Sequence, residues 1–297
     1  MKRCSRSVLL VFIAGSLIMA APPAGAATAG YVVRVTKTSR WSTPSPDPSG
    51  ITYLPKQHRL LISDSGVDNT RVWKGRNLFL AGLKGHLRAA LSLKKATRNP
   101  VGIVWNARAK ALFVADDNAD AIYRSTAGPD GHIGTRDDRV RRIIYTEDFG
   151  FTDPHGVAWR PTGEVLIVLD SQTGRVYKFH RGKDGLFGTK DDVVKGFGTF
   201  RYGLTHPEGI TYDSVTDHLF MVSSPQRFVV ETTMTGVLVR TIDLSATGIN
   251  RPSALMFARG SDGKPHHLYI TDRGVNYSTD PNENDGRLFE FKLVKVP

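Results

Sequence analysis

The chain has 297 residues, of which 40% are hydrophobic and 23% charged, so its composition is that of a folded globular protein rather than a disordered or fibrous one. The only cysteine, Cys4, lies at the extreme N-terminus. This excludes a disulfide framework, a thiolate zinc site and a cysteine nucleophile from the rest of the chain. A net charge of +12 favours anionic partners, such as cell-surface polymers or lipid head groups.

The first 26 residues have the pattern of a secretory signal peptide. A short basic start is followed by an apolar stretch over residues 8–21, which is too short to span a bilayer comfortably. Ala24-Gly25-Ala26 then supplies small residues at the positions that a signal peptidase recognises. We therefore predict a signal peptide over 1–26, one domain over 27–297, and a secreted or periplasmic protein. The alternative is an uncleaved anchor; no second apolar run of membrane length follows.

Five segments of the chain begin alike, with Pro-Xaa-Gly and an aliphatic residue. They start at Pro48, Pro100, Pro154, Pro207 and Pro252, and alanine replaces the glycine in the last. Three residues after each glycine position stands an aromatic side chain, and these are Tyr53, Trp105, Trp159, Tyr212 and Phe257. Five aromatic residues at five equivalent positions, in a chain that is 9% aromatic, indicate an internal repeat of about 50 residues.

Each repeat contains several short β-rich stretches. A second apolar run begins ten residues after the glycine in four units, and further runs follow, such as residues 175–179 and 237–242. Gly, Pro, Asn and Asp separate these runs, and no 3.6-residue apolar period persists for three turns. Four strands per unit predict the blades of an all-β, five-bladed β-propeller with antiparallel blades. A sixth, degenerate blade within residues 71–98 is the alternative.

The N-terminal segment Tyr31–Val35 predicts how the ring closes. It is an apolar strand that precedes the first unit, whereas the fifth unit supplies only three strands before the chain ends. We expect this strand to pair as the outer strand of the last blade, because such pairing leaves no long free sheet edge at the seam.

An aspartate stands at the end of the second predicted strand in four of the five units. These residues are Asp64, Asp116, Asp170 and Asp272, and Ser223 takes the place in the fourth unit. A carboxylate at the end of a strand can accept backbone N–H bonds from the turn that follows. We therefore predict a structural role for this position.

Two insertions share the pattern DGxxGTxDD and lie 54 residues apart, so they occupy the same hairpin of adjacent blades. Glycines at their two bends permit positive φ, which brings the leading and trailing aspartates together. Carboxylates converging in one small loop can bind Ca²⁺, and the predicted metal ligands are Asp130, Asp137, Asp138, Asp184, Asp191 and Asp192. The alternative is a turn that is capped by its own aspartates without a metal.

The repeat pattern resembles NHL-repeat and gluconolactonase-like propellers, and the stretch 207–242 is similar to the bacterial exported SdiA-regulated propeller family. The resemblance covers residues 48–291 and implies that the residue between Pro and Gly lies near the mouth of the central channel. Gluconolactonase-like enzymes hold a divalent metal there with an acidic ligand from the first blade. Ser49 stands at that position in this sequence.

The channel position supplies three predicted ligand-contacting residues, Ser49, His155 and Glu208. His155 and Glu208 could bind a metal or act as acid and base; alternatively, neighbouring turns satisfy both side chains. The leading hypothesis is an exported, non-catalytic propeller that binds a protein or an anionic cell-surface ligand, with calcium in the hairpin loops. The rival is a metal-dependent lactonase or esterase centred on these two residues. No stacking pattern of a nucleic-acid module is present, so no nucleic acid is expected as a partner.

Overall fold

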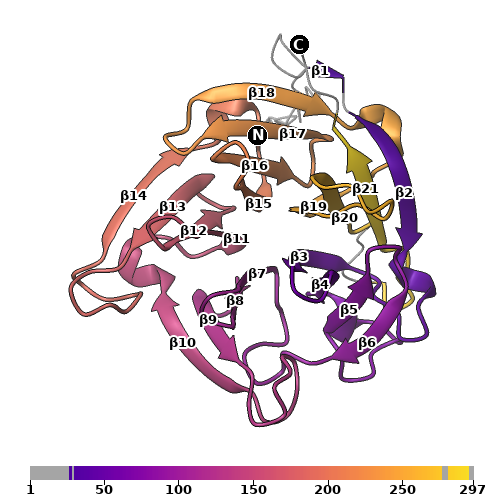
Figure 1. Cartoon of the computed structure of the whole chain (residues 1–297), viewed down its shortest axis with the longest axis horizontal. Helices are drawn as coiled ribbons and strands as arrows, with labels where there is room; N and C mark the ends of the chain where they lie inside the picture. The colour runs from indigo at the N-terminus through magenta and orange to yellow at the C-terminus, as the bar shows by residue number, and fades with distance from the viewer. Residues whose placement is uncertain (1–26, 29, 276–279, 294–297) are drawn as a thin grey trace, which may run out of the picture.

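The computed structural model describes residues 27–28, 30–275 and 280–293; the predicted signal peptide over 1–26 lies outside them. These residues form five sheets of antiparallel strands arranged as a ring (Figure 1). The predicted all-β, five-bladed propeller is therefore confirmed. The alternative of a sixth blade is wrong, because residues 71–98 contain the two outer strands of the first blade. No helix in the described part of the chain is long and apolar enough to cross a membrane.

The strands of each blade run from the centre of the ring to its edge, and their bounds are as follows. Blade 1 contains β3 (Pro48–Leu54), β4 (Arg59–Asp64), β5 (Leu78–Gly82) and β6 (Leu87–Leu91). Blade 2 contains β7 (Gly102–Asn106), β8 (Ala111–Asp116), β9 (Ala121–Thr126) and β10 (Arg139–Tyr145). Blade 3 contains β11 (Pro154–Arg160), β12 (Val165–Asp170), β13 (Arg175–His180) and β14 (Val193–Gly198).

Blade 4 contains β15 (Pro207–Asp213), β16 (His218–Ser223), β17 (Phe228–Thr233) and β18 (Leu238–Asp243), and the short β1 (Ala27–Thr28) adds to it parallel to β18. Blade 5 contains β19 (Pro252–Ala258), β20 (His267–Asp272), β21 (Arg287–Lys292) and β2 (Tyr31–Lys37). The helices are single 3-10 turns, η1 (Thr38–Arg40), η2 (Val67–Asn69), η3 (Thr146–Phe149), η4 (Phe200–Tyr202) and η5 (Ser245–Thr247).

The hydrophobic core consists of five clusters, and each one fills the space between two neighbouring blades. Leu61 of blade 1, for example, belongs to the same cluster as Ile103 of blade 2. The second strands are buried on both faces, as the all-buried patterns of β8, β12 and β20 show. A strand buried on both faces needs a neighbour on each side, so the blades are stable only as a ring.

The ring closes as the sequence predicts, because β2 pairs antiparallel with β21 over Tyr31 to Lys37. Within this pairing Arg34 lies opposite Glu290. In blade 4, Arg240 of the outer strand lies opposite Glu231 in the same way. Blades 4 and 5 therefore share an arginine–glutamate pair between their two outer strands.

Neighbouring inner strands are in backbone contact at the repeated glycines. A Cβ atom on Gly156 would lie 2.7 Å from the carbonyl oxygen of Glu208 in the next blade. A Cβ atom on Gly102 would overlap the carbonyl oxygen of His155. Glycine occupies this repeat position because the next blade leaves no room for a side chain.

The glycine contacts predict a large cost for adding one methyl group. We expect Gly102→Ala to lower the free energy of unfolding by about 2 kcal/mol or more, because the backbone of the next blade must move. Gly198→Ala in β14 is the matched control, since a Cβ atom there meets nothing within 4 Å. Urea unfolding of both variants measures the difference. Equal stability of the two would show that the inner strands are not packed backbone against backbone.

Candidate functional site in the central cavity

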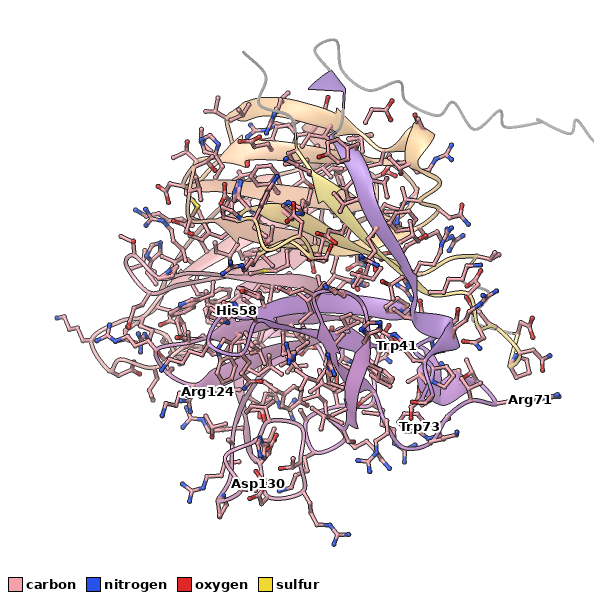
Figure 2. All side chains as sticks on the ribbon, turned by 45° about the vertical axis from the view of Figure 1, so that its right-hand side comes forward. Trp41, His58, Arg71, Trp73, Arg124 and Asp130 are labelled. Carbon is pink, nitrogen blue, oxygen red and sulfur yellow. The ribbon has the colours of Figure 1, made fainter. Side chains whose placement is uncertain are left out.

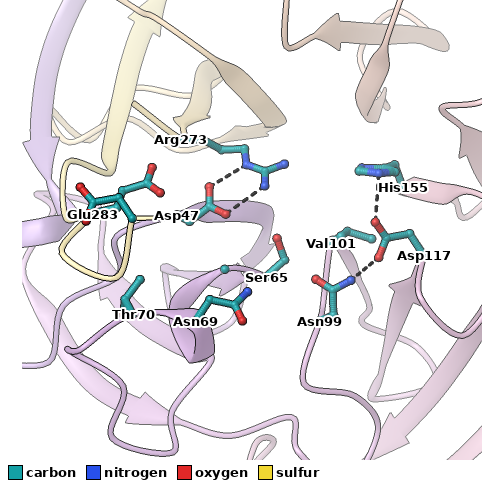
Figure 3. Close-up of a pocket in the computed structure, with 12 residues that line it drawn as sticks. Asp47, Ser65, Asn69, Thr70, Asn99, Val101, Asp117, His155, Arg273 and Glu283 are labelled. Atoms are coloured by element: carbon teal, nitrogen blue, oxygen red, sulfur yellow. Dashed lines mark hydrogen bonds and ion pairs between the residues drawn. The ribbon is translucent and has the colours of Figure 1, made fainter. Parts of the chain in front are cut away.

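The segments that lead into the inner strands and the loops that follow the second strands surround a cavity of about 160 Å³. Arg273 and His155 face it from opposite sides (Figure 3). Three positions of the repeat supply most of its lining: the residue before the proline, the residue after the proline, and the residue that follows the second strand. The residue before the proline supplies Asp47 and Asn99, and the residue after the proline supplies Val101 and His155. The residue after the second strand supplies Ser65, Asp117 and Arg273.

One side of the cavity is held by a buried arginine. The Arg273 guanidinium makes a bidentate ion pair with Asp47, through Nε to Oδ1 at 2.6 Å and Nη2 to Oδ2 at 2.9 Å. Its Nη1 also donates to Glu208 Oε2 at 3.3 Å. Only 14% of the Arg273 side chain is exposed, and a buried guanidinium needs such partners because it always carries its charge.

The other side of the cavity is held by a histidine between two carboxylates. His155 Nε2 lies 3.3 Å from Asp117 Oδ2 and 3.4 Å from Asp153 Oδ1. Asn99 Nδ2 donates to the other oxygen of Asp117. Burial lowers the pKa of His155, but the two carboxylates and the charge of Glu208 outweigh it and raise that pKa to about 10. His155 is therefore an imidazolium at neutral pH.

The three predicted channel residues occupy different places in this arrangement. His155 lines the cavity, and Glu208 reaches it through Arg273. Ser49 is buried below the surface of the cavity, where it donates to the carbonyl of Asp47 and shares a 2.6 Å hydrogen bond with Ser65. His155 and Glu208 are thus close to one another, whereas Ser49 supports the lining from behind.

The cavity is acidic although the protein as a whole is basic. Each of its two cations, Arg273 and protonated His155, contacts two carboxylates. Asp280 and Glu283 add further acidic lining. The charges that line or touch the cavity therefore sum to a negative value, which favours a cationic ligand.

A divalent ion could also use part of this arrangement. Among the described residues, Asp117, Asp153 and His155 form the one group of at least three His, Cys, Asp or Glu side chains whose ligand atoms all lie within 4.8 Å of one another. Two carboxylates and one imidazole are a ligand set that suits divalent metals. The imidazolium proton of His155 would have to leave before the ring nitrogen could bind a metal.

The aspartates at the ends of the second strands hold the cavity residues in place. Asp64 accepts the backbone N–H of Asp47 at 2.9 Å, and Asp170 accepts that of Asp153 at 2.8 Å. Asp170 also accepts an N–H from the following turn, at Thr173. The predicted structural role of this position is confirmed, and it extends further than predicted in three units, where Asp64, Asp170 and Asp272 also accept the backbone N–H of the residue before the proline.

The two hairpin loops have the same internal hydrogen bonds. In the first loop Asp137 accepts the backbone N–H of Asp130 at 2.8 Å and the Thr135 hydroxyl at 2.6 Å, and Asp138 accepts the N–H of Gly134 at 2.8 Å. The Thr135 and Asp130 hydrogen bonds lower the pKa of Asp137. Asp130 lies near the tip of a loop that projects from the ring (Figure 2).

In the second loop the same bonds join Asp191 to Asp184 at 3.2 Å, Asp191 to Thr189 at 2.7 Å, and Asp192 to Gly188 at 2.7 Å. The four bend glycines have φ between 69° and 84°, as the sequence pattern predicts. Both loops are therefore closed by their own carboxylates.

Both loops also pack against the preceding blade. Ile133 of the first loop packs into the cluster between blades 1 and 2, and Phe187 of the second packs edge-on against Phe113 of blade 2. The carbonyl of Gly134 accepts the backbone N–H of Ser92, just beyond β6. The sequence signal for this role is the apolar residue before the second glycine of each insertion.

Sequence reasoning missed five residues of the cavity, Asp47, Asn99, Asp117, Asp153 and Arg273. It considered only the residue between proline and glycine. The residue before each proline is polar in all five units, and the residue after the second strand is polar in all five as well. Those two repeated polar positions are the signal that could have located the cavity.

The raised pKa of His155 predicts a specific pH dependence. The folded-state pKa of about 10 lies above the ordinary histidine value of 6.5, so the stabilisation that His155 contributes is fully present below pH 6.5 and is lost as pH rises through 10. We expect the difference in unfolding free energy between wild type and His155→Gln to shrink over that window, by about 5 kcal/mol, because each pKa unit corresponds to about 1.4 kcal/mol. Urea unfolding at several pH values measures this difference. An NMR titration in which His155 itself titrates near pH 6.5 would contradict the prediction.

No known protein-family model matches this sequence, and no curated protein is similar to it in sequence. Solved structures are similar to it in fold. Glutaminyl cyclase from Myxococcus xanthus matches with a TM-score of 0.57 and 14% identity over 91% of this chain and 100% of that one. A PQQ-bound aldose sugar dehydrogenase from Streptomyces coelicolor matches with a TM-score of 0.52 and 16% identity over 92% and 100%.

A luciferin-regenerating enzyme matches with a TM-score of 0.54 and 12% identity over 86% of this chain and 94% of that one. Identities this low show a shared fold and nothing about activity. The cyclase and the dehydrogenase are β-propeller proteins, so the comparisons agree with the strand topology: this chain has a β-propeller fold.

Proposed function

We propose that this protein is an exported, non-catalytic β-propeller that binds a ligand or a protein partner through a cationic group. The observation that carries the proposal is the charge of the central cavity, where two cations face four carboxylates and two more acidic side chains line the wall. Arg273 already fills one half as an internal guanidinium. The half around Asp117 and His155 is the part that an external cation would enter.

The size of the cavity limits what can bind. At about 160 Å³ it is smaller than the roughly 300–1,000 Å³ of a site that encloses a drug-sized molecule. It suits the end of a Lys or Arg side chain, a small organic ammonium ion or a divalent ion. A protein partner that inserts one basic side chain agrees best with a rigid ring whose loops surround the cavity.

Three further features of this function are predictions from the sequence pattern. Export rests on the signal-like residues 1–26. Similarity to the SdiA-regulated propellers rests on the stretch 207–242. Binding of the exterior to an anionic cell-surface polymer rests on the net charge, which is +12 for the whole sequence and +9 without Lys2, Arg3 and Arg6 of the predicted signal peptide.

The test of the cation site is calorimetric titration with N-acetyl-lysine amide, N-acetyl-arginine amide and the divalent ions Ca²⁺, Mg²⁺ and Zn²⁺. We expect wild type to bind at least one of them and Asp117→Asn to weaken that binding about tenfold, which corresponds to about 1.4 kcal/mol. Asp148→Asn is the control, because Asp148 is an exposed carboxylate in η3 away from the cavity. Equal affinity of wild type and Asp117→Asn, or no binding of any probe, rejects the site.

The rival function is a metal-dependent lactonase or esterase, and the cluster of Asp117, Asp153 and His155 is the observation that favours it. A divalent ion held there would polarise a carbonyl or lower the pKa of a bound water. A panel of lactones and esters, assayed with divalent ions, separates the two functions. Turnover that is lost in both His155→Ala and Glu208→Ala supports the hydrolase, and activity indifferent to both changes excludes this centre.

Calcium in the two hairpin loops stays a prediction from the sequence pattern. A site that exists only in the folded state adds about 2.7 kcal/mol to stability when calcium is present at 100 times its dissociation constant. If the loops bind calcium, the melting temperature of wild type rises with calcium, and that of the double variant Asp137→Ala/Asp191→Ala does not. A wild-type melting temperature that is independent of millimolar calcium ends this prediction.

A further inference from the structure

The opposite end of the channel carries a second cavity, which the proposed function does not use. Each inner strand begins at the central cavity and ends about 20 Å away, given about 3.3 Å per residue in a strand. At that far end lies a cavity of about 870 Å³. Its lining includes one aromatic side chain from each of the five blades. Phe257 of blade 5 is buried, and we call the cavity the aromatic funnel after the four that are partly exposed: Tyr53, Trp105, Trp159 and Tyr212.

The four aromatic rings are held in fixed positions. Each is partly buried and packs on one of the clusters between blades. The Tyr53 hydroxyl shares a 2.7 Å hydrogen bond with His58 Nδ1, and the Tyr212 hydroxyl donates to Asp217 Oδ1 at 2.9 Å. Rings anchored in this way lose little entropy when a ligand stacks on them, so they are a preorganised apolar surface.

The fifth blade supplies a flat polar surface. His266 Nε2 lies 2.9 Å from Asp213 Oδ1, and the imidazole stacks on Phe257 with ring centroids 4.5 Å apart and planes 7° from parallel. Hydrogen bonds from His266 and Val215 help to lower the pKa of Asp213, although burial acts in the opposite direction. Asp213 is therefore ionised, but its carboxylate already accepts hydrogen bonds from His266 and Val215.

The remaining charge in the funnel is positive. Asp213 is the one carboxylate among its described lining residues, and two arginines line it as well. Arg108 is ion-paired with Glu164 at 2.9 Å, which leaves Arg259 as the unpaired charge. Among the described residues Arg259 takes part in no salt bridge, and its Nε donates to the carbonyl of Gly263 at 2.7 Å. This leaves the two terminal nitrogens of Arg259 without an anionic partner at the edge of an aromatic cavity.

A neighbouring groove extends the same chemistry. It has a volume of about 690 Å³, lies between blades 1 and 2, and shares Pro55, Trp105 and Ala107 with the funnel. Leucine side chains form much of its lining, and its fully charged residues are Lys56 and Lys110. Apolar walls with a basic rim therefore continue beyond the funnel.

We propose that the aromatic funnel is a second ligand site, which binds an organic anion with a flat apolar ring system. Its volume falls within the roughly 300–1,000 Å³ of small-molecule sites, and such sites combine aromatic walls with a few polar groups that orient the ligand. The rings would stack on the ligand, and Arg259 would pair with its carboxylate or sulfonate. None of these residues belongs to the central cavity, so this inference stands or fails independently of the proposed function.

The first measurement is fluorescence titration with 8-anilinonaphthalene-1-sulfonate, an aromatic anion. We expect saturable binding of one molecule per protein. 2-Naphthoate should displace the dye at least fivefold more effectively than 2-naphthamide, which has the same ring system and no charge. Absence of saturable binding, or equal displacement by the two naphthalenes, overturns the proposal. Displacement by cellobiose but not by 2-naphthoate would identify a site for neutral sugars instead, and also overturns it.

Variants locate the binding in the funnel. Arg259→Gln should weaken dye binding at least fivefold and remove the preference for 2-naphthoate, because it removes the charge and keeps a polar side chain. Arg141→Gln is the matched control, since Arg141 is an exposed arginine on the outer strand β10. Trp105→Leu should weaken the binding of 2-naphthoate and of 2-naphthamide to the same extent. Thermal melting confirms that each variant is folded, and unchanged binding in both Arg259→Gln and Trp105→Leu rejects the site.

Discussion

The constraint on which this structure depends is the backbone contact between neighbouring inner strands. At Gly102, Gly156 and Gly209 a carbonyl oxygen of the next blade leaves no room for a Cβ atom, and at Gly50 the backbone of Ile103 in the next blade lies 3.0 Å from where a Cβ atom would be. These contacts limit how far apart the inner strands stand, and hence the width of the channel. They also favour a common register, because the small residues at this position, four glycines and Ala254, face one another in neighbouring blades. All equivalent residues therefore lie in layers around the axis.

The layers explain why the two ends of the channel differ in chemistry. Residues just before the glycine gather in a small acidic cavity, and residues three places after it gather in a wide aromatic one. The backbone of the first layer is held by hydrogen bonds within its own blade, because the N–H groups of Asp47 and Asp153 donate to Asp64 and Asp170. A side chain of the second layer is held by packing between blades. One repeat thus produces a small cavity with charged and polar lining at one end and a wide cavity with aromatic lining at the other.

Much of the fold follows from the sequence, whereas the site follows only in part. The repeat predicted the blade number, because five equivalent units form five blades, and the unmatched strand Tyr31–Val35 predicted the seam. His155 and Glu208 were found because they occupy the repeat position itself. Asp117 and Arg273 were missed because the residue after the second strand changes in type from blade to blade, and only the folded ring brings residues 156 apart in the chain to one cavity. The packing of Ile133 and Phe187 on the preceding blade could not be predicted for the same reason, because their partners lie in another blade.

The seam has a consequence for how the molecule reaches its native state. Strand β2 is synthesised before all five inner strands, yet its partner β21 ends at Lys292, so their pairing spans nearly the whole chain. Loops of this length close slowly, and contacts of high sequence separation delay folding. The first blade can assemble early, but the last one forms only after β21 has been made. From then until β2 pairs with it, the edge of β21 is exposed, which makes the interval before closure the period when this chain is most open to aggregation.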